Sequence, residues 1–197
     1  NGTDLTIGLT KKHLWAGGKC ETPTGHPFFP NIPTEEVFTS PDCERVDGVV
    51  YSALPLIHHG NKIDRFWMRF ENGSVVDFDA VIGRDALKSI LDIDEGACRL
   101  GEVALISKNT PIRESGLLFF DTLYDENASC HLALGVGFAE CYEGGYDMTN
   151  EELRAAGMNI SATHVDFMIG TDDLTITGID ADGNEEPVFV NGQWSWE

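Results

Sequence analysis

The chain has 197 residues, of which 42% are hydrophobic and 10% aromatic, so it can bury a core in one large domain or two small ones. It carries 33 Asp and Glu residues against 13 Lys and Arg residues, and its formal net charge is −20. This acidity argues against nucleic-acid binding, which requires a basic surface. It suits cation binding, although we expect most of these carboxylates to be ordinary surface groups.

The sequence has no pattern typical of membrane insertion or secretion. No apolar run approaches the roughly 18 residues of a transmembrane helix, and no basic segment followed by an apolar one indicates a signal peptide. The five cysteines are odd in number and lack C-x-x-C spacing, which favours reduced thiols over a disulfide framework or a zinc ribbon. We therefore expect a cytoplasmic protein without membrane contact. The strand pattern begins at once after Asn1, so we also expect this chain to be part of a longer protein.

The first half of the chain consists mainly of strand patterns and turns. Strands are expected over residues 3–9, 46–53, 63–70 and 74–80. Asn72-Gly73 lies between the last two strands and predicts a tight hairpin. Residues 17–33 are rich in Gly, Pro, Thr and Asn, which is typical of a loop, and we expect Phe28 and Phe29 to attach this loop to the core.

The second half of the chain adds short helices between further strands. Helices are expected over residues 85–91 and 149–157, and strands over 100–106, 164–169, 174–179 and 188–194. Thr149 or Asn150 would cap the second helix at its start, and Gly157 would end it. No repeat, low-complexity segment or linker is visible. The sequence therefore predicts a single α+β domain with strand-rich mixed sheets and a few short helices.

The clearest candidate for a functional element is the strand around residues 164–169. Val165, Phe167 and Ile169 alternate with His164 and Asp166, so the imidazole and the carboxylate project from the same face. Such a pair on a rigid strand makes half of a metal site, and it equally suits a structural ion pair within a sheet.

Three other residues stand in settings that suit metal ligands. Glu102 interrupts an apolar strand, where an unpaired carboxylate would be costly. Glu36 lies next to Glu35 in an extended segment between two prolines, where neighbouring side chains point in opposite directions. His131 lies among small residues. With His164 and Asp166 these residues form the ligand set of a two-metal hydrolase, although each of them alone also fits a structural role.

Other motifs give weaker signals. His58-His59 lies in a turn, and residues 180–186 lack the spacing of a calcium-binding loop. No G-x-S-x-G motif supports a serine hydrolase. Cys130 and His131 are adjacent in sequence and so are poorly placed to act as nucleophile and base.

Several of these stretches together resemble one family. They are residues 31–41, 100–104, 125–131 and 159–170. In this order and at similar spacing they resemble the C-terminal catalytic domain of the aminopeptidase T / aminopeptidase S type of metallo-aminopeptidases. The resemblance extends over residues 2–194 and implies that the family's N-terminal α/β domain lies outside this chain.

The resemblance implies a pair of divalent metal ions, peptide substrates and a homodimer of the full-length protein. Glu36, Glu102, His131, His164 and Asp166 fall on the family's ligand positions. Zinc, cobalt, manganese and magnesium all suit mixed carboxylate and histidine ligands. The expected reaction is hydrolysis of an N-terminal peptide bond by water activated between the two metals.

Glu102 is the first candidate for the proton-transferring base, with Glu35 and Glu126 behind it. The family has a tyrosine seven residues after its first histidine, and this chain has Phe138 there. The alternative hypothesis is accordingly a catalytically weakened or inactive metal-binding module.

Overall fold

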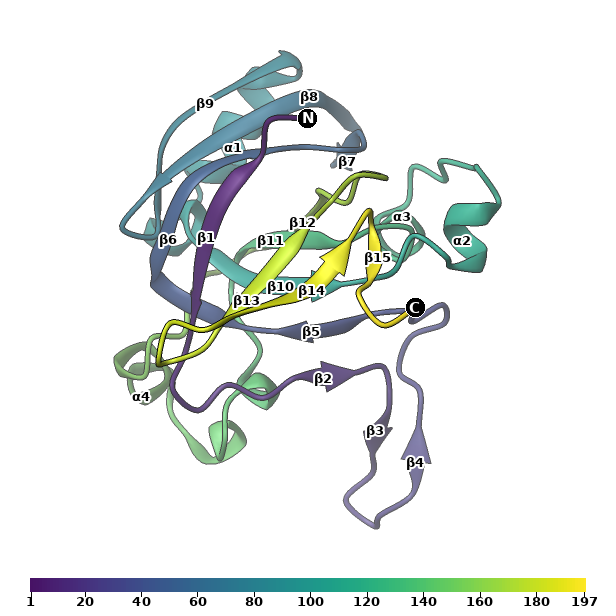
Figure 1. Cartoon of the computed structure of the whole chain (residues 1–197). Coiled ribbons are helices and arrows are strands. Elements are labelled where there is room, and N and C mark those ends of the chain that lie inside the picture. The colour runs from purple at the N-terminus through teal and green to yellow at the C-terminus, as the bar shows by residue number, and fades with distance from the viewer.

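The computed structural model describes all residues from Asn1 to Glu197 (Figure 1). Two five-stranded sheets make up most of the fold, and a three-stranded sheet and a two-stranded hairpin complete it. The predicted strand-rich α+β class is confirmed. The strand directions are not mixed, however, because every paired strand runs antiparallel to its neighbour.

The first large sheet comes from the N-terminal half of the chain. Its strands are β1 (Asp4–Leu9), β6 (Pro41–Tyr51), β7 (Leu56–His58), β8 (Asn61–Glu71) and β9 (Ser74–Ile82). They pair in the order β1-β6-β8-β7, and β9 also pairs with β8. Asn72 and Gly73 form the predicted hairpin turn, with φ angles of 49° and 81°. Positive φ at both central residues is what a two-residue hairpin turn requires.

The second large sheet gathers strands that lie far apart in the sequence. Its strands are β2 (Ala16–Gly17), β5 (Val37–Thr39), β10 (Leu100–Leu105), β11 (His131–Gly135) and β12 (His164–Met168). The order is β12-β11-β10-β5-β2, so β10 lies at the centre. This sheet therefore brings together most of the segments in which the sequence predicts metal ligands.

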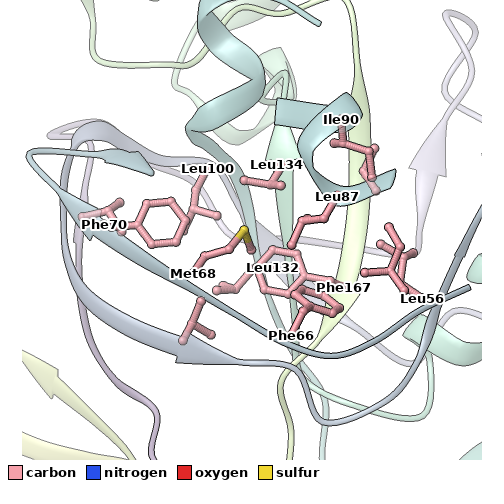
Figure 2. Close-up of a cluster of buried hydrophobic side chains, with 14 residues drawn as sticks. Leu56, Phe66, Met68, Phe70, Leu87, Ile90, Leu100, Leu132, Leu134 and Phe167 are labelled. Atoms are coloured by element: carbon pink, nitrogen blue, oxygen red, sulfur yellow. The ribbon is translucent and has the colours of Figure 1, made fainter. Parts of the chain in front are cut away.

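The main core lies between the two large sheets (Figure 2). Phe66 and Met68 of β8 face Leu132 of β11 and Phe167 of β12 across it, and all four side chains are fully buried. Helix α1 (Arg84–Leu91) closes the core with Leu87 and Ile90. Burying side chains of this size contributes about 1.5–3 kcal/mol each, so the core holds one face of the second sheet rigidly.

The remaining elements are short. The helices are α2 (Pro111–Glu114), α3 (Thr122–Glu126) and α4 (Asn150–Ala155), with 3-10 turns η1 (Glu95–Cys98), η2 (Ala139–Cys141) and η3 (Gly145–Asp147). The small sheet consists of β13 (Ile176–Ile179), β14 (Glu185–Val190) and β15 (Gln193–Trp194). Thr149 caps α4 as expected, in a reciprocal capping box with Glu152.

The predicted loop over residues 17–33 contains a small hairpin, which extends away from the body of the molecule (Figure 1). Its strands are β3 (Cys20–Glu21) and β4 (Pro27–Phe28). The expectation that Phe28 and Phe29 attach this segment to the core is wrong, because their side chains are 43% and 61% exposed. The hairpin is held by its own turn hydrogen bonds, including those of Thr22 to His26.

Candidate metal centre

The register of the second sheet aligns the predicted carboxylates. Glu102 of β10 lies opposite Ala133 of β11, and Ala133 lies opposite Asp166 of β12. Residues opposite one another in neighbouring strands project from the same face. Their sequence neighbours, such as Phe167, point into the core instead.

A close backbone contact places Glu102 within β10. Pairing between β10 and β11 shifts by one residue between Leu100 and Glu102. At the shift, a Cβ on Gly101 would lie only 2.3 Å from the carbonyl oxygens of Gly135 and Val136. Only glycine allows this approach, and the resulting bulge sets the direction of the Glu102 side chain.

His131 is buried against Glu36. Its Nε2 atom lies 3.2 Å from Glu36 Oε2 and 4.0 Å from Glu102 Oε1. Its Nδ1 atom lies 3.1 Å from the carbonyl oxygen of Glu126. Since a carbonyl oxygen only accepts, Nδ1 carries the proton and Nε2 faces the carboxylates. Asn127 accepts a hydrogen bond from the Glu35 amide at 2.6 Å and so fixes the segment that carries Glu36.

His164 faces two carboxylates in the same way. Its Nε2 atom lies 3.1 Å from Glu102 Oε2 and 3.2 Å from Asp166 Oδ1. Its Nδ1 atom donates to the carbonyl oxygen of Val136 at 2.8 Å. Both histidines thus have Nδ1 held by the backbone and Nε2 directed into the site, an orientation that is usual for metal-ligating imidazoles.

The structure adds Glu126, at the end of α3, to the five predicted residues. The ligand atoms form three overlapping groups, each within 4.8 Å: Glu36, Glu102 and His131; Glu102, His164 and Asp166; Glu126, His131 and Asp166. The sequence offered Glu126 only as a reserve base. The only sequence signal for Glu126 as a ligand is that it precedes His131 by five residues. That spacing does not fix the distance between the two side chains, because a helix-to-strand turn lies between them.

Negative charge dominates the electrostatics of this cluster. Burial raises the pKa of Glu102, and burial together with the Asp166 charge raises the pKa of Glu126 to about 8. Burial opposes protonation of His131, but the hydrogen bond to Glu36 and the nearby carboxylates outweigh it and raise its pKa to about 9. His164 behaves alike through Asp166 and Glu102, with a pKa of about 10. In the absence of a metal ion, bound protons therefore compensate the carboxylates.

The residues fit divalent metal ions. Two imidazole nitrogens and four carboxylates converge on one face. The carboxylates of Glu36, Glu102 and Asp166 contact the histidines through carboxylate oxygens and Nε2 atoms, which are also the atoms that bind metals. A pair of cations would neutralise the four carboxylates without requiring the histidines to be protonated. Nitrogen and oxygen ligands of this kind are typical of zinc, manganese and cobalt sites.

The cluster forms the floor of a cavity of about 300 Å³. Phe138 lies on its wall, with its ring centroid 4.8 Å from that of His164 and 5.6 Å from that of Phe38. No tyrosine or other phenolic hydroxyl lines the cavity. The cavity is open to the surface and lies above the metal-ligand candidates, where a small substrate would bind.

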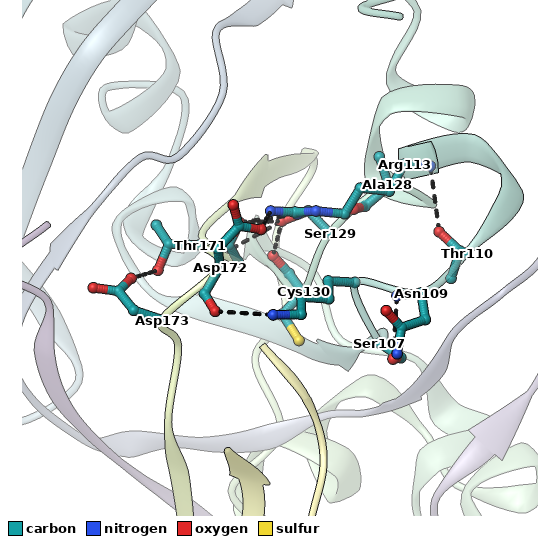
Figure 3. A network of polar contacts seen from close by, with 12 residues as sticks. Ser107, Asn109, Thr110, Arg113, Ala128, Ser129, Cys130, Thr171, Asp172 and Asp173 are labelled. Atoms are coloured by element: carbon teal, nitrogen blue, oxygen red, sulfur yellow. Dashed lines mark hydrogen bonds and ion pairs between the residues drawn. The ribbon is translucent and has the colours of Figure 1, made fainter. Parts of the chain in front are cut away.

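Arg113 is the centre of a network of polar contacts next to two strands of the site (Figure 3). Its guanidinium donates to the carbonyl oxygens of Ala128 at 3.2 Å and Gly170 at 3.3 Å, and to Asp172 at 2.9 Å. Ala128 precedes β11 and Gly170 follows β12. This side chain therefore ties together the ends of the two strands that carry the histidines and Asp166.

Other residues considered in the sequence lie outside the cluster. Glu35 is exposed, and the rings of His58 and His59 meet edge to face at a turn, with centroids 4.2 Å apart. Cys130 is buried, and its thiol donates to the Ile106 carbonyl at 3.3 Å, so it faces away from His131. Residues 180–186 form a turn in which Asp180 accepts hydrogen bonds from Asn184.

Comparison with known proteins identifies the family. The model of the thermophilic metalloprotease (M29) family matches residues 1–194. The chain therefore belongs to the M29 metalloproteases, which confirms the family resemblance seen in the sequence.

Individual relatives agree with this assignment. Aminopeptidase AmpS of Bacillus subtilis is 53% identical over 195 residues, which are 99% of this chain and 48% of that protein. Aminopeptidase T of Thermus aquaticus is 49% identical over 193 residues, 98% of this chain and 47% of that protein. Wild-type AmpT from Thermus thermophilus has a matching structure, with a TM-score of 0.93 and 46% identity, covering 99% of this chain and 48% of that one. The chain thus spans about half the length of the relatives that it matches.

None of the helices has the length and apolar character needed to span a bilayer.

Proposed function

We propose that this chain is the catalytic domain of a metal-dependent aminopeptidase. The observation that carries the proposal is the set of three overlapping ligand groups, built on Glu102, His131 and Asp166, in a member of a metalloprotease family. We assign Glu36, Glu102, His131, His164 and Asp166 as metal ligands, and Glu126 as a further one. Glu102, His131 and Asp166 each belong to two of the three groups and so connect the cluster.

The protein's own residues supply proton transfer. When bound, a pair of divalent ions would lower the pKa of a water molecule and polarise the scissile carbonyl. Glu102 would accept a proton from the attacking water and pass it to the leaving amine. The backbone carbonyls at Val136 and Glu126 hold both imidazoles in the ligating orientation throughout.

The cavity suits the amino terminus of a peptide. Its lining includes five carboxylates and no Lys or Arg, which favours a substrate that carries positive charge near the scissile bond. We place the enzyme in the cytoplasm and, by analogy with the aminopeptidases that it resembles, expect a homodimer of the full-length protein. An inactive metal-binding module is less well supported, since the cavity above the cluster remains open.

The proposal is tested by hydrolysis of leucine p-nitroanilide by the complete protein. We expect a chelator to abolish hydrolysis and zinc, cobalt or manganese to restore it, with two equivalents of metal in elemental analysis. His164→Ala should reduce kcat/KM by at least about 100-fold. His58→Ala, which alters a histidine that belongs to no ligand group and does not line the cavity, is the control and should retain full activity. Hydrolysis that persists in chelator, or in His164→Ala, would contradict the metal assignment.

A further inference from the structure

One carboxylate of the cavity has no place in the ligand set. Glu140, in η2, lines the same cavity as the candidate ligands but belongs to none of the three ligand groups. It is half-buried and has no Lys or Arg partner. Its one hydrogen bond comes from the hydroxyl of Tyr146, at 2.7 Å from Oε2. The other oxygen, Oε1, has no hydrogen-bond partner and remains free to accept.

Counting charge singles out this residue. This step rests on the proposed function, in which two divalent ions bring four positive charges. The four carboxylates in the ligand groups offset these charges, and neutral histidines add none. No other cation lines the cavity. Glu140 is therefore the one carboxylate of the cavity that the metal ions do not compensate, and a half-buried, uncompensated carboxylate favours a cationic ligand.

The local fold holds the Glu140 carboxylate in place. Turn η3 packs directly onto η2, because Gly145 presses against Ala139: a Cβ on Gly145 would lie 2.0 Å from the Ala139 carbonyl oxygen. The amide of Gly145 donates to the Tyr142 carbonyl at 2.9 Å. This packing carries Tyr146 back over Glu140, although the ring itself is 77% exposed. An exposed tyrosine fixed in this way orients a carboxylate rather than filling a core.

We propose that Glu140, oriented by Tyr146, recognises the basic side chain of an N-terminal Arg or Lys residue in the substrate. The α-amino group of the substrate lies two bonds from the scissile carbonyl carbon, so it binds close to the ligand groups. Glu140 does not belong to these groups. A long basic side chain reaches beyond that cluster to the cavity wall. Glu140 is thus a specificity residue, and Tyr146 is a positioning residue that acts through it.

The test compares the p-nitroanilides of Arg, Lys, Met and Leu on the complete, metal-loaded protein. Met approximates the length of Lys without its charge. Glu140→Gln should lower kcat/KM for the Arg and Lys substrates by about tenfold, equivalent to about 1.4 kcal/mol. The loss should fall on KM, because the side-chain contact is the same in the ground state and the transition state. The Met and Leu substrates should change less than about twofold. Tyr146→Phe should give a smaller loss on the same two basic substrates.

Glu143→Gln is the matched control. Glu143 lies on the surface three residues from Glu140, pairs with Lys12 and does not line the cavity. It should leave all four substrates unchanged. An equal loss on all substrates, or no loss on Arg and Lys, would overturn the proposal.

A binding measurement keeps this test independent of turnover. Titration calorimetry with L-argininol and L-methioninol, which lack the scissile amide, should show a preference for argininol that Glu140→Gln removes. Equal binding of the two amino alcohols by the unaltered protein would also overturn the assignment. By contrast, failure of the unaltered protein to hydrolyse any of the four substrates would count against the proposed function rather than against Glu140.

Discussion

His131 Nε2 lies 3.2 Å from Glu36 Oε2, although the two residues come from opposite sides of the central strand β10. β5, which follows Glu36, pairs with one edge of β10, and β11, which begins at His131, pairs with the other. Glu102 projects from β10 between them and lies 4.0 Å from the same imidazole. β10 thus lies at the centre of the site, and its pairing with β5 and β11 sets the distance between the residues that these two strands carry.

Removing Glu102 should affect metal binding more than removing Glu36 does. Glu102 belongs to two of the ligand groups, whereas Glu36 belongs to one. If two ions bind as proposed, Glu36→Gln should lower the affinity for one of them by at least about 10-fold, and Glu102→Gln should lower the affinity for both. Even residues that only support metal ligands change metal affinity by about 10–100-fold. Calorimetric titration of the metal-free protein with zinc measures this. Two unaltered sites in Glu102→Gln would rule out a shared role for this carboxylate.

The metal-free protein should lose stability as pH rises. The pKa of Glu126 is raised from 4.5 to about 8, and the pKa values of His131 and His164 are raised from 6.5 to about 9 and about 10. A raised pKa means that the folded state holds the proton more tightly than the unfolded state. The stabilisation is therefore complete below the unfolded pKa and is lost as pH passes through the folded one. For Glu126 the loss spans pH 4.5 to about 8, and for the histidines it spans pH 6.5 to about 10.

Thermal unfolding in chelator across this pH range measures the effect, and Tm should fall steadily. The metal-loaded protein is the comparison. Metal ions take the place of the protons, so its Tm should vary less over the same range. A metal-free Tm that stays level or rises between pH 6.5 and pH 10 would contradict the protonation states assigned to the cluster.

Phe138→Tyr should raise kcat. Phe138 lines the cavity beside His164. The family resemblance described above implies a tyrosine at this position. A hydroxyl there would donate to the charge that develops on the carbonyl oxygen, and one such donor is worth up to about 100–1,000-fold. Because the rest of the site is unchanged, we expect a gain of about tenfold in kcat with leucine p-nitroanilide. Metal content and Tm of the variant serve as controls. An unchanged kcat in a fully metallated variant would show that this position does not supply the missing donor.

Replacing Arg113 should destabilise the protein, because this side chain connects the ends of β11 and β12. Arg113→Met removes the donors to the Ala128 and Gly170 carbonyl oxygens (Figure 3). The Ala128 carbonyl then loses its side-chain donor and the Gly170 carbonyl keeps only the Ser129 hydroxyl, so we expect a loss of about 1–3 kcal/mol in the free energy of unfolding. Urea denaturation measures it. Asp172→Asn is the matched control, because it removes only an ion pair whose acid is 83% exposed, and it should cost less than about 1 kcal/mol. Equal losses in the two variants would show that the carbonyl contacts contribute little.

Local patterns predicted much of this fold. The alternation around His164 and Asp166 placed both side chains on one face, and the Asn72-Gly73 turn fixed the hairpin of β8 and β9. These signals depend only on the two-residue period of a strand and on the positive φ of a turn, so a short segment contains all the information. The segment around Phe28 and Phe29 misled the same reasoning, because aromatic residues need a facing surface to become buried, and the hairpin extends away from the body of the molecule.

The sequence by itself determined the class of this protein: a strand-rich α+β domain with an acidic surface and five residues of the type that bind metals. Only the tertiary structure decided that Glu126 joins this cluster and that Glu140 stands apart from it in the same cavity. The physical reason is the range of the interactions. A residue's face on its own strand is local, but its distance from residues on other strands depends on the sheet order and on the close approach at Gly101.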